Sequence, residues 1–215
     1  MIKLWHCHNS RSLRVLWALE ELGLDYQLIS MSFPPRFLDK SFLEINPLGT
    51  VPFMQDDGAS FSESGAMLMY LGQKCSPSKL SLSSGDKRYD QYLNYMFQSD
   101  ATLTFPQTLI LRYSQFESGD RQNQQIVDDY SQWFLARLKG VNETLLTQKY
   151  LCGDSFTLAD IAVGYALYLG RLLGLDEHFK PQTKAYLERI ISRPAFKKIK
   201  DIGLENAAYK IEPVA

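Results

Sequence analysis

The segment "INPLGTVPFMQDDGASFSESGAMLMYLGQ", Ile45 to Gln73, decides the fold of the first third of the chain. Short apolar runs near 51–54 and 60–62 predict two β-strands, and the turn at Asp56-Asp57-Gly58 joins them as a hairpin. Apolar residues at helical spacing then predict a helix from Ser64 to about Lys74. The segment therefore predicts a strand–strand–helix unit.

The residues before this segment predict a second small unit. Residues 3–7 alternate as a short strand does, and a helical pattern runs from Ser12 to a stop at Gly23. Tyr26 to Met31 reads as another strand. A strand, a helix and a strand within about 30 residues make a βαβ unit with parallel strands. We therefore predict a thioredoxin-like βαβ-ββα domain over residues 1–76.

Beyond residue 76 the strand signals nearly vanish. Residues 77–87 have the Ser, Pro and Gly content of a linker, and helical runs follow at about 87–118, 121–147, 157–174, 181–192 and 194–203. Thr157 and Asp160 form a capping-box pattern, flanked by Phe156 and Ile161 as a hydrophobic staple. The fold class predicted is α/β plus all-α, with an all-helical C-terminal domain over residues 88–215.

The amino-acid composition indicates which compartment and which kinds of partner to expect. The chain has 215 residues, of which 45% are hydrophobic and 22% charged, the balance of a globular protein with a full core. A formal net charge of -1 gives no basic face for nucleic acid, and no stretch approaches a signal-peptide core or a membrane span. Three widely spaced cysteines fit a reducing compartment. We expect a cytoplasmic protein without nucleic-acid or membrane partners.

Pro52 interrupts a segment that otherwise reads as a strand. A proline donates no ladder hydrogen bond, so it belongs on an edge or at a forced bend. A cis Val51–Pro52 bond would satisfy both conditions and turn the Val51 backbone groups toward a ligand. Local sequence alone still favours the trans bond.

Glu63 and Ser64 lie where the predicted strand meets the predicted helix. A serine at a helix start is ordinarily an N-cap. A helix N-terminus also attracts a carboxylate through its N–H groups and dipole, and the Glu63 carboxylate could hold an ammonium. An α-amino acid carries both groups on one carbon and would fit.

Taken together, the βαββα start with "NPLGTVPF" and "ESGAML", the linker, and the helical half with "FTLADI" and "RPAF" resemble the cytosolic glutathione transferases. The resemblance covers nearly the whole chain. It implies glutathione as co-substrate, a homodimer, a cis bond before Pro52, and pairing of the Val51 backbone with the cysteinyl part of glutathione. It also implies that Glu63 and Ser64 hold the γ-glutamyl end. Lys40, and with less support Arg11, could reach the glycyl carboxylate, although such side chains are usually just solvated.

The resemblance places the thiol-activating residue in the turn between the first strand and the first helix. Counting back from Arg14-Val15, Asn9 falls where the Ser-type classes have their serine, and Ser10 is its neighbour. An amide and a hydroxyl can each donate to a thiolate, and both could instead cap the helix. Asn9 is favoured by register and Ser10 by chemistry, so the choice stays open. Cys7 lies outside that position and has no Cys-x-x-Cys partner.

Several other residues could contribute to a functional site, but each can also be explained by an ordinary structural role. His6 and His8 should face away from Cys7, so too few ligands converge and we predict no metal site. Asp100 could approach the ligand's amino group across a dimer interface, or be an exposed carboxylate. The aromatic residues that could line a second-substrate pocket, or pack in a helical core, are Phe105, Tyr113 and Phe116.

The predicted function is that of a glutathione transferase acting on a small hydrophobic electrophile. An Asn-type turn resembles bacterial classes that favour disulfide reduction, so a glutathione-dependent disulfide-bond oxidoreductase or peroxidase is an alternative. A non-catalytic glutathione-transferase-like interaction module is another, and the retained Glu63-Ser64 pair argues against it.

Overall fold

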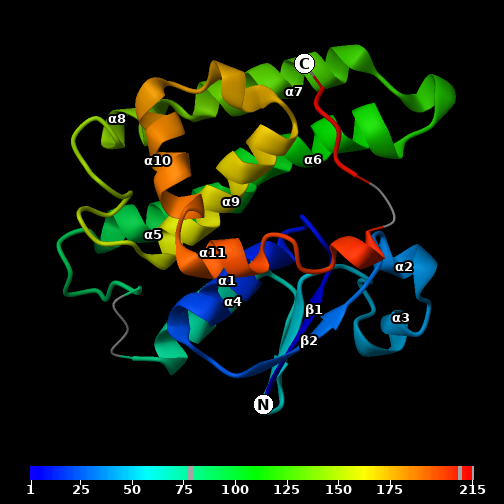
Figure 1. Ribbon diagram of the computed structural model, residues 1–215, viewed down its shortest axis with the longest axis horizontal. Helices are drawn as coiled ribbons and strands as arrows, with labels where there is room; N and C mark the ends of the chain where they lie inside the picture. The colour runs from blue at the N-terminus through cyan, green and yellow to red at the C-terminus, as the bar shows by residue number, and fades with distance from the viewer. Residues whose placement is uncertain (77–79, 208–209, 215) are drawn as a thin grey trace. The chain divides into compact units, whose positions relative to one another are not determined.

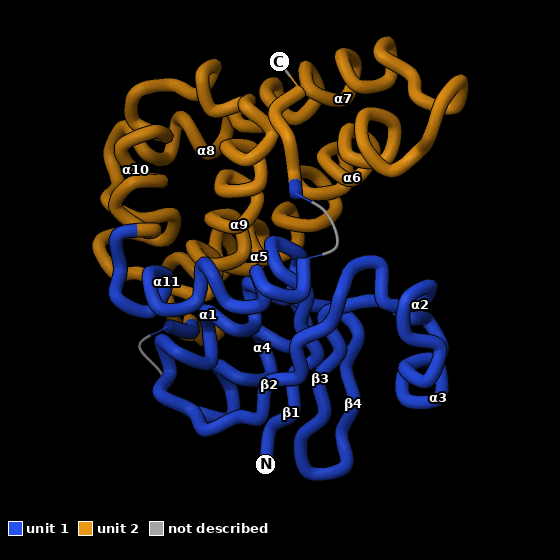
Figure 2. The backbone as a smooth tube through the Cα atoms, turned by 45° about the vertical axis from the view of Figure 1, so that its right-hand side comes forward, with its two compact units in different colours: residues 1–81, 192–210 blue, residues 82–191, 211–215 orange. Residues whose placement is uncertain are grey.

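The computed structural model describes residues 1–76, 80–207 and 210–214. The first three residues of the predicted linker 77–87 lie outside the described residues. The described residues divide into two compact units (Figure 2): unit 1 holds residues 1–81 and 192–210, and unit 2 holds residues 82–191 and 211–215. Residues 192–210 thus group with the first unit, and the predicted domain boundaries stay a prediction.

Unit 1 is built on a four-stranded mixed sheet (Figure 1). Its strands are β1 (Ile2–His6), β2 (Tyr26–Ser30), β3 (Phe53–Asp56) and β4 (Ala59–Phe61), in the order β2-β1-β3-β4. β1 and β2 are parallel, which confirms the predicted βαβ unit, and β3 pairs antiparallel with β1 and β4. The thioredoxin-like arrangement and the α/β plus all-α class are therefore confirmed.

The longer helices lie where the spacing of apolar residues predicted helical runs. They are α1 (Ser12–Leu22), α2 (Pro35–Leu38), α3 (Phe42–Ile45), α4 (Ser64–Lys74), α5 (Tyr89–Gln98), α6 (Phe105–Leu111), α7 (Gln124–Arg137), α8 (Lys139–Thr144), α9 (Leu158–Leu172), α10 (Pro181–Ile191) and α11 (Pro194–Ile199). Two π-helical turns, at 99–104 and 112–116, extend α5 and α6 into one run, as predicted for 87–118. α2 and α3, of four residues each, were not predicted.

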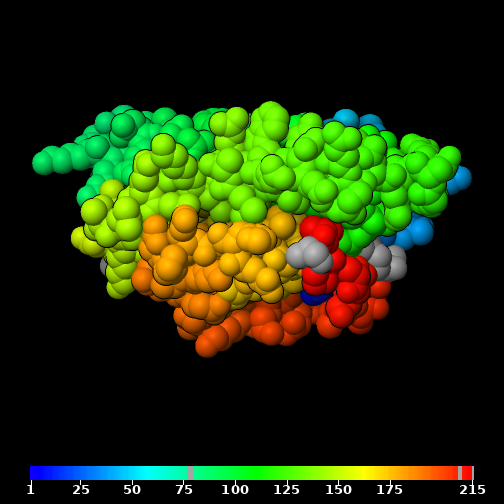
Figure 3. Space-filling view, turned by 90° about the horizontal axis from the view of Figure 1, so that it is seen from above, coloured from blue at the N-terminus to red at the C-terminus, as the bar shows by residue number. Residues whose placement is uncertain are grey.

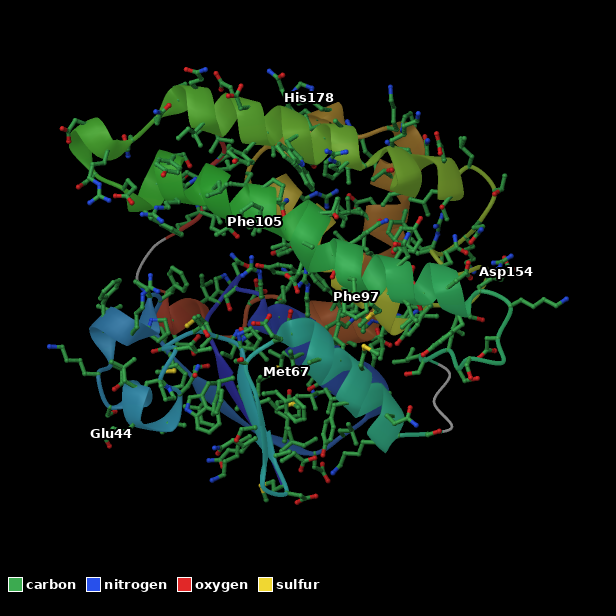
Figure 4. All side chains as sticks on the ribbon, turned by 180° about the vertical axis from the view of Figure 1, so that it is seen from behind. Glu44, Met67, Phe97, Phe105, Asp154 and His178 are labelled. Carbon is green, nitrogen blue, oxygen red and sulfur yellow. The ribbon has the colours of Figure 1, made fainter. Side chains whose placement is uncertain are left out.

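Both faces of the sheet are covered. Successive side chains of a strand point to opposite faces, so Leu4 and Trp5 of β1 serve two different layers. On one side α1 packs beside α4 (Figure 1), whose Met67 is fully buried (Figure 4). On the other side the Trp5 ring lies 5.3 Å from that of Phe53 and 6.4 Å from that of Phe42. α3 therefore covers the face opposite α1 by means of Phe42.

The segment after α10 returns to unit 1 and docks on α1. Arg193 donates to both carboxylate oxygens of Glu21, at 2.6 and 2.7 Å, and Trp17 donates to the same carboxylate at 3.1 Å. The Phe196 ring packs edge-on against Trp17 with centroids 4.7 Å apart. The "RPAF" motif is thus the docking element of α11.

Unit 2 is arranged around α9, whose residues are buried on nearly every face. The predicted capping box of Thr157 and Asp160 is confirmed. The buried Asp160 carboxylate also accepts from the Leu151 N–H at 2.9 Å and the Tyr186 hydroxyl at 2.8 Å. The run of α7 and α8 lies along an outer face of this unit, beside α10 (Figure 3). Within the described ranges, no helix combines the length and apolar character that crossing a membrane requires.

Candidate functional site

Three sequence motifs of unit 1 meet at one end of the sheet. Trp5 pairs with Phe53 across the β1–β3 ladder, so the end of β1 lies beside the start of β3. The turn after β1 therefore runs next to Val51 and Pro52. The peptide bond between Val51 and Pro52 is cis, as the family resemblance implied and in contrast to the trans bond that local sequence favoured. Pro52 is buried, whereas Val51 stays half-buried.

The turn between β1 and α1 is tight. The Ser10 N–H donates to the Cys7 carbonyl at 3.1 Å, and the Leu13 N–H donates to the Ser10 carbonyl at 3.0 Å. Asn9 adopts a left-handed backbone with φ of 56°, a conformation that asparagine tolerates better than most residues. Ser10 Oγ accepts from the Ser12 N–H at 3.3 Å, but the N-cap of α1 is Arg11, so Ser10 stabilises the turn and is not the helix cap. Asn9 and Ser10 are both half-buried.

A buried arginine of α1 contacts the first residue of α4. Ser64 is the first residue of α4, and Glu63 precedes it with an extended backbone as the N-cap. Arg14 of α1 is fully buried, and its Nη1 donates to Ser64 Oγ at 3.0 Å. A guanidinium only donates, so Ser64 Oγ acts as an acceptor in this contact. A positive charge behind a helix N-terminus makes the position favourable for a carboxylate.

Arg14 is the site residue that sequence reasoning missed. A signal was present, because Arg14 stands within the apolar run Leu13 to Leu16 on a predicted buried helix. Charged residues are almost never fully buried unless they are paired. The Ser64 contact, made 50 positions away, provides such a partner.

Glu63 and Lys40 are exposed and differ in their surroundings. Glu63 lies at the rim of the α4 N-terminus, where its carboxylate faces solvent. Lys40 lies between α2 and α3, shortly before the exposed Glu44 of α3 (Figure 4 labels Glu44). Within the described ranges, no hydrogen bond or ion pair joins the Lys40 ammonium to the turn, to Val51 or to Ser64. Arg11 is half-buried at the N-cap of α1.

The remaining candidates belong to unit 2. Asp100 is half-buried in the π-helical turn between α5 and α6. Phe105 and Phe116 are 54% and 42% exposed, more than a residue packed in a helical core would be (Figure 4 labels Phe105), and Tyr113 is half-buried. Their predicted contributions to a second-substrate pocket stay predictions.

The cysteines and histidines do not form a reactive or metal centre in the described part of the chain. Burial raises the pKa of the Cys7 thiol to about 12, so this sulfur stays protonated and is a poor nucleophile. No group of three or more His, Cys, Asp or Glu side chains is placed to hold a metal ion in the ranges 1–76, 80–207 and 210–214.

Comparison with known proteins agrees with this geometry. The family model described as "Glutathione S-transferase, N-terminal domain" matches residues 4–79, and "Glutathione S-transferase, C-terminal domain" matches residues 104–194. The chain is 26% identical to Glutathione S-transferase 3 of Schizosaccharomyces pombe, with 91% of this chain and 85% of the relative covered. It is 28% identical to Glutathione S-transferase GstB of Escherichia coli, with 93% and 97% covered.

A solved structure shares the fold. A sphingomonad glutathione S-transferase complexed with glutathione superimposes with a TM-score of 0.81 at 22% identity, covering 94% of this chain and 98% of that one. The two family models describe the halves of one protein family and together span most of this chain. The chain therefore belongs to the cytosolic glutathione S-transferase superfamily.

Proposed function

We propose that this glutathione S-transferase binds glutathione at the end of the unit 1 sheet and activates its thiol for attack on a small hydrophobic electrophile. One observation carries the proposal. The Val51–Pro52 segment, the Asn9-Ser10 turn and the α4 N-terminus backed by Arg14 lie at the same end of one small domain.

The two ends of glutathione would be held by opposite charges. Ser64, the α4 N-terminus and the buried Arg14 favour the γ-glutamyl carboxylate, and the exposed Glu63 carboxylate favours the neighbouring ammonium. The Val51 backbone would pair with the cysteinyl part. Lys40 is the candidate for the glycyl carboxylate, because its ammonium is exposed on the segment over the sheet.

The turn at Asn9 and Ser10 would supply the chemistry. A free thiol with a pKa of about 8.5 is mostly protonated at neutral pH, and only the thiolate is a good nucleophile. Lowering that pKa by about two units takes about 2.7 kcal/mol of preferential thiolate stabilisation. One charge-assisted hydrogen bond, at about 1.5–3 kcal/mol, and the α1 dipole, at about 0.3–1, are sufficient.

We further propose that the protein acts as a cytoplasmic homodimer with a detoxification role. The three cysteines are all free thiols, as expected in a reducing compartment. The thiolate would attack an electrophilic carbon to form a thioether and displace a leaving group such as a halide anion. It could instead attack a disulfide sulfur, which forms a mixed disulfide and releases the other sulfur as a thiolate.

The test combines binding with turnover. Calorimetry should give saturable glutathione binding, weakened about tenfold or more in Ser64→Ala and unchanged in the matched control Ser60→Ala, at the exposed position of β4. Turnover is then measured with a dinitroaryl halide and with a glutathione mixed disulfide. Absence of binding at millimolar glutathione would refute the proposal. Binding without turnover of either substrate would favour a non-catalytic module.

A further inference from the structure

A line of hydrogen bonds, one buried and two partly buried, begins at the proposed thiol-activating turn. His6 ends β1 and Ser12 begins α1, and both side chains are fully buried. Ser12 Oγ lies 2.8 Å from His6 Nδ1 and 2.7 Å from Ser10 Oγ. At the other end, His6 Nε2 lies 3.2 Å from the carbonyl oxygen of Ile202. Four groups are thus connected, from the Ile202 carbonyl to the Ser10 hydroxyl.

The Ile202 carbonyl fixes the direction of this line at its far end. A carbonyl oxygen only accepts, so His6 must carry its hydrogen on Nε2. Burial lowers the pKa of His6 to about 4, so at neutral pH the ring has one N–H and its Nδ1 is an acceptor. The Ser12 hydroxyl therefore donates to Nδ1 at 2.8 Å in preference to the Cys7 carbonyl, which lies farther away at 3.3 Å. His8 Nδ1 lies 3.1 Å from the same oxygen, whose second lone pair can accept from it.

The same reasoning assigns the hydrogen of Ser10. Ser12 has a single hydroxyl hydrogen, already given to His6, so at 2.7 Å the Ser10 hydroxyl must be the donor and Ser12 Oγ the acceptor. The reverse direction would leave His6 Nδ1 facing an oxygen lone pair in a buried position, at a cost of about 1–3 kcal/mol. Ser10 Oγ meanwhile accepts from the Ser12 N–H at 3.3 Å. Ser10 thus has no hydrogen left for a thiolate.

Building on the proposed function of this turn, we propose that His6 and Ser12 are positioning residues. They hold the Ser10 hydroxyl hydrogen inward and leave the Asn9 amide as the group that donates to the glutathione sulfur. An amide nitrogen carries two hydrogens, so Asn9 can serve the sulfur while keeping another contact. Ser10 then shapes the turn and does not touch the reacting atom.

The origin of this line is remote in the sequence. Ile202 follows α11 and stands 196 positions after His6 in the sequence. The next residue, Gly203, has a left-handed φ of 81°, and a Cβ there would lie 3.3 Å from the His6 ring. The segment after α11 therefore packs directly on the imidazole and keeps the Ile202 carbonyl on Nε2.

The first test does not involve glutathione. In ligand-free protein at pH 7, the ¹⁵N chemical shifts of His6, assigned from the signal lost in His6→Asn, should show a neutral ring protonated at Nε2. A ring protonated at Nδ1 would reverse the line and overturn the inference. This result stands whether or not the protein binds glutathione, so it separates failure of the inference from failure of the proposed function.

The second test titrates the thiol of bound glutathione by its ultraviolet absorbance. Asn9→Ala should raise the apparent thiol pKa by about one unit or more, a tenfold loss of thiolate stabilisation, and Ser10→Ala by less than about 0.3 unit. Equal effects, or a larger effect of Ser10→Ala, would overturn the assignment.

A matched pair at His6 tests the positioning role itself. His6→Asn keeps an acceptor near the position of Nδ1, whereas His6→Gln keeps a donor near that of Nε2 and loses the acceptor for Ser12. The bound thiol pKa should stay within about 0.3 unit of wild type in His6→Asn and move by about 0.5 unit or more in His6→Gln, with glutathione affinity changed less than about twofold in both. If the bound thiol had the wild-type pKa in both His6→Asn and His6→Gln, the result would contradict the positioning role of His6.

Discussion

Lowering the pH from 7 to 5 should destabilise unit 1 through one histidine. His6 is fully buried between β1, α1 and the segment after α11. Burial lowers its pKa to about 4, and the charge of His8 acts in the same direction, whereas the hydrogen bond to Ile202 and the charge of Glu205 oppose the shift. In the unfolded chain the same imidazole has a pKa of about 6.5.

The sign and size follow from proton linkage. As the pH falls below about 6.5 the unfolded state takes up a proton that the native state refuses until about pH 4. The free energy of unfolding therefore decreases across this window. The full loss is about 3.4 kcal/mol, from about 2.5 pKa units, and about 2 kcal/mol of it falls between pH 7 and pH 5.

The assay is urea unfolding at pH 7, 6 and 5, followed by tryptophan fluorescence and by circular dichroism. His6→Asn removes the titrating group, so its free energy of unfolding should fall by about 2 kcal/mol less than that of wild type over this range. The control is the same substitution at an exposed histidine, His178→Asn (Figure 4 labels its position), which leaves His6 and its contacts in place. Equal pH dependence in wild type and His6→Asn would refute the assigned burial of this ring.

Three further outcomes are expected. Phe196→Ala should lower the free energy of unfolding of unit 1 by about 3–5 kcal/mol, since the ring is 1% exposed and packed on α1; chemical denaturation measures it. Tyr186→Phe removes one donor from the buried Asp160 carboxyl and should cost about 1–3 kcal/mol, read from the urea midpoint. Iodoacetamide should modify half-buried Cys75 first, because Cys7 and Cys152 are buried with pKa values raised to about 12; peptide mass mapping identifies the alkylated residue.

Each of these outcomes has a matched reference. Leu204→Ala, at a side chain 55% exposed, should be nearly neutral beside Phe196→Ala. Tyr113→Phe makes the same chemical change at a tyrosine that does not bind Asp160, and its effect on stability should be small beside that of Tyr186→Phe. Alkylation of Cys7 or Cys152 at the rate of Cys75 in the native protein would contradict their burial, and labelling of both in urea confirms that the reagent can reach them once unfolded.

Most of the fold could be predicted because its signals are local. The alternation of β1, the helical spacing of α1 and the hairpin turn at Asp57-Gly58 each fit within one element. The helices α2 and α3 escaped prediction because four residues are too few for a period to be visible. The π-helical turns near Asp100 changed the geometry of a predicted helical run without interrupting its hydrophobic pattern.

The site was only partly predictable, for a physical reason. Pro52 could be recognised locally because a proline within a strand is unusual. Glu63 and Ser64 are ordinary residues for a helix start, and their role was predicted through the family resemblance. The partners that set their chemistry are remote: Arg14 reaches Ser64 across 50 positions, and Ile202 orients His6 across 196. The direction of a hydrogen bond depends on such a partner, so the choice between Asn9 and Ser10 could not be made before the contacts were known.

The return of α11 to the first unit has a consequence for how the protein is made. Residues 1–81 leave the ribosome before Phe196 and Arg193, which are the aromatic and ionic partners of the first helix, because residues 82–191 are synthesised in between. The nascent first unit must therefore leave the Trp17 surface uncovered until the segment that holds α11 has been synthesised. Truncated polypeptides released before that point would expose an apolar helix face and become natural clients of chaperones and proteases.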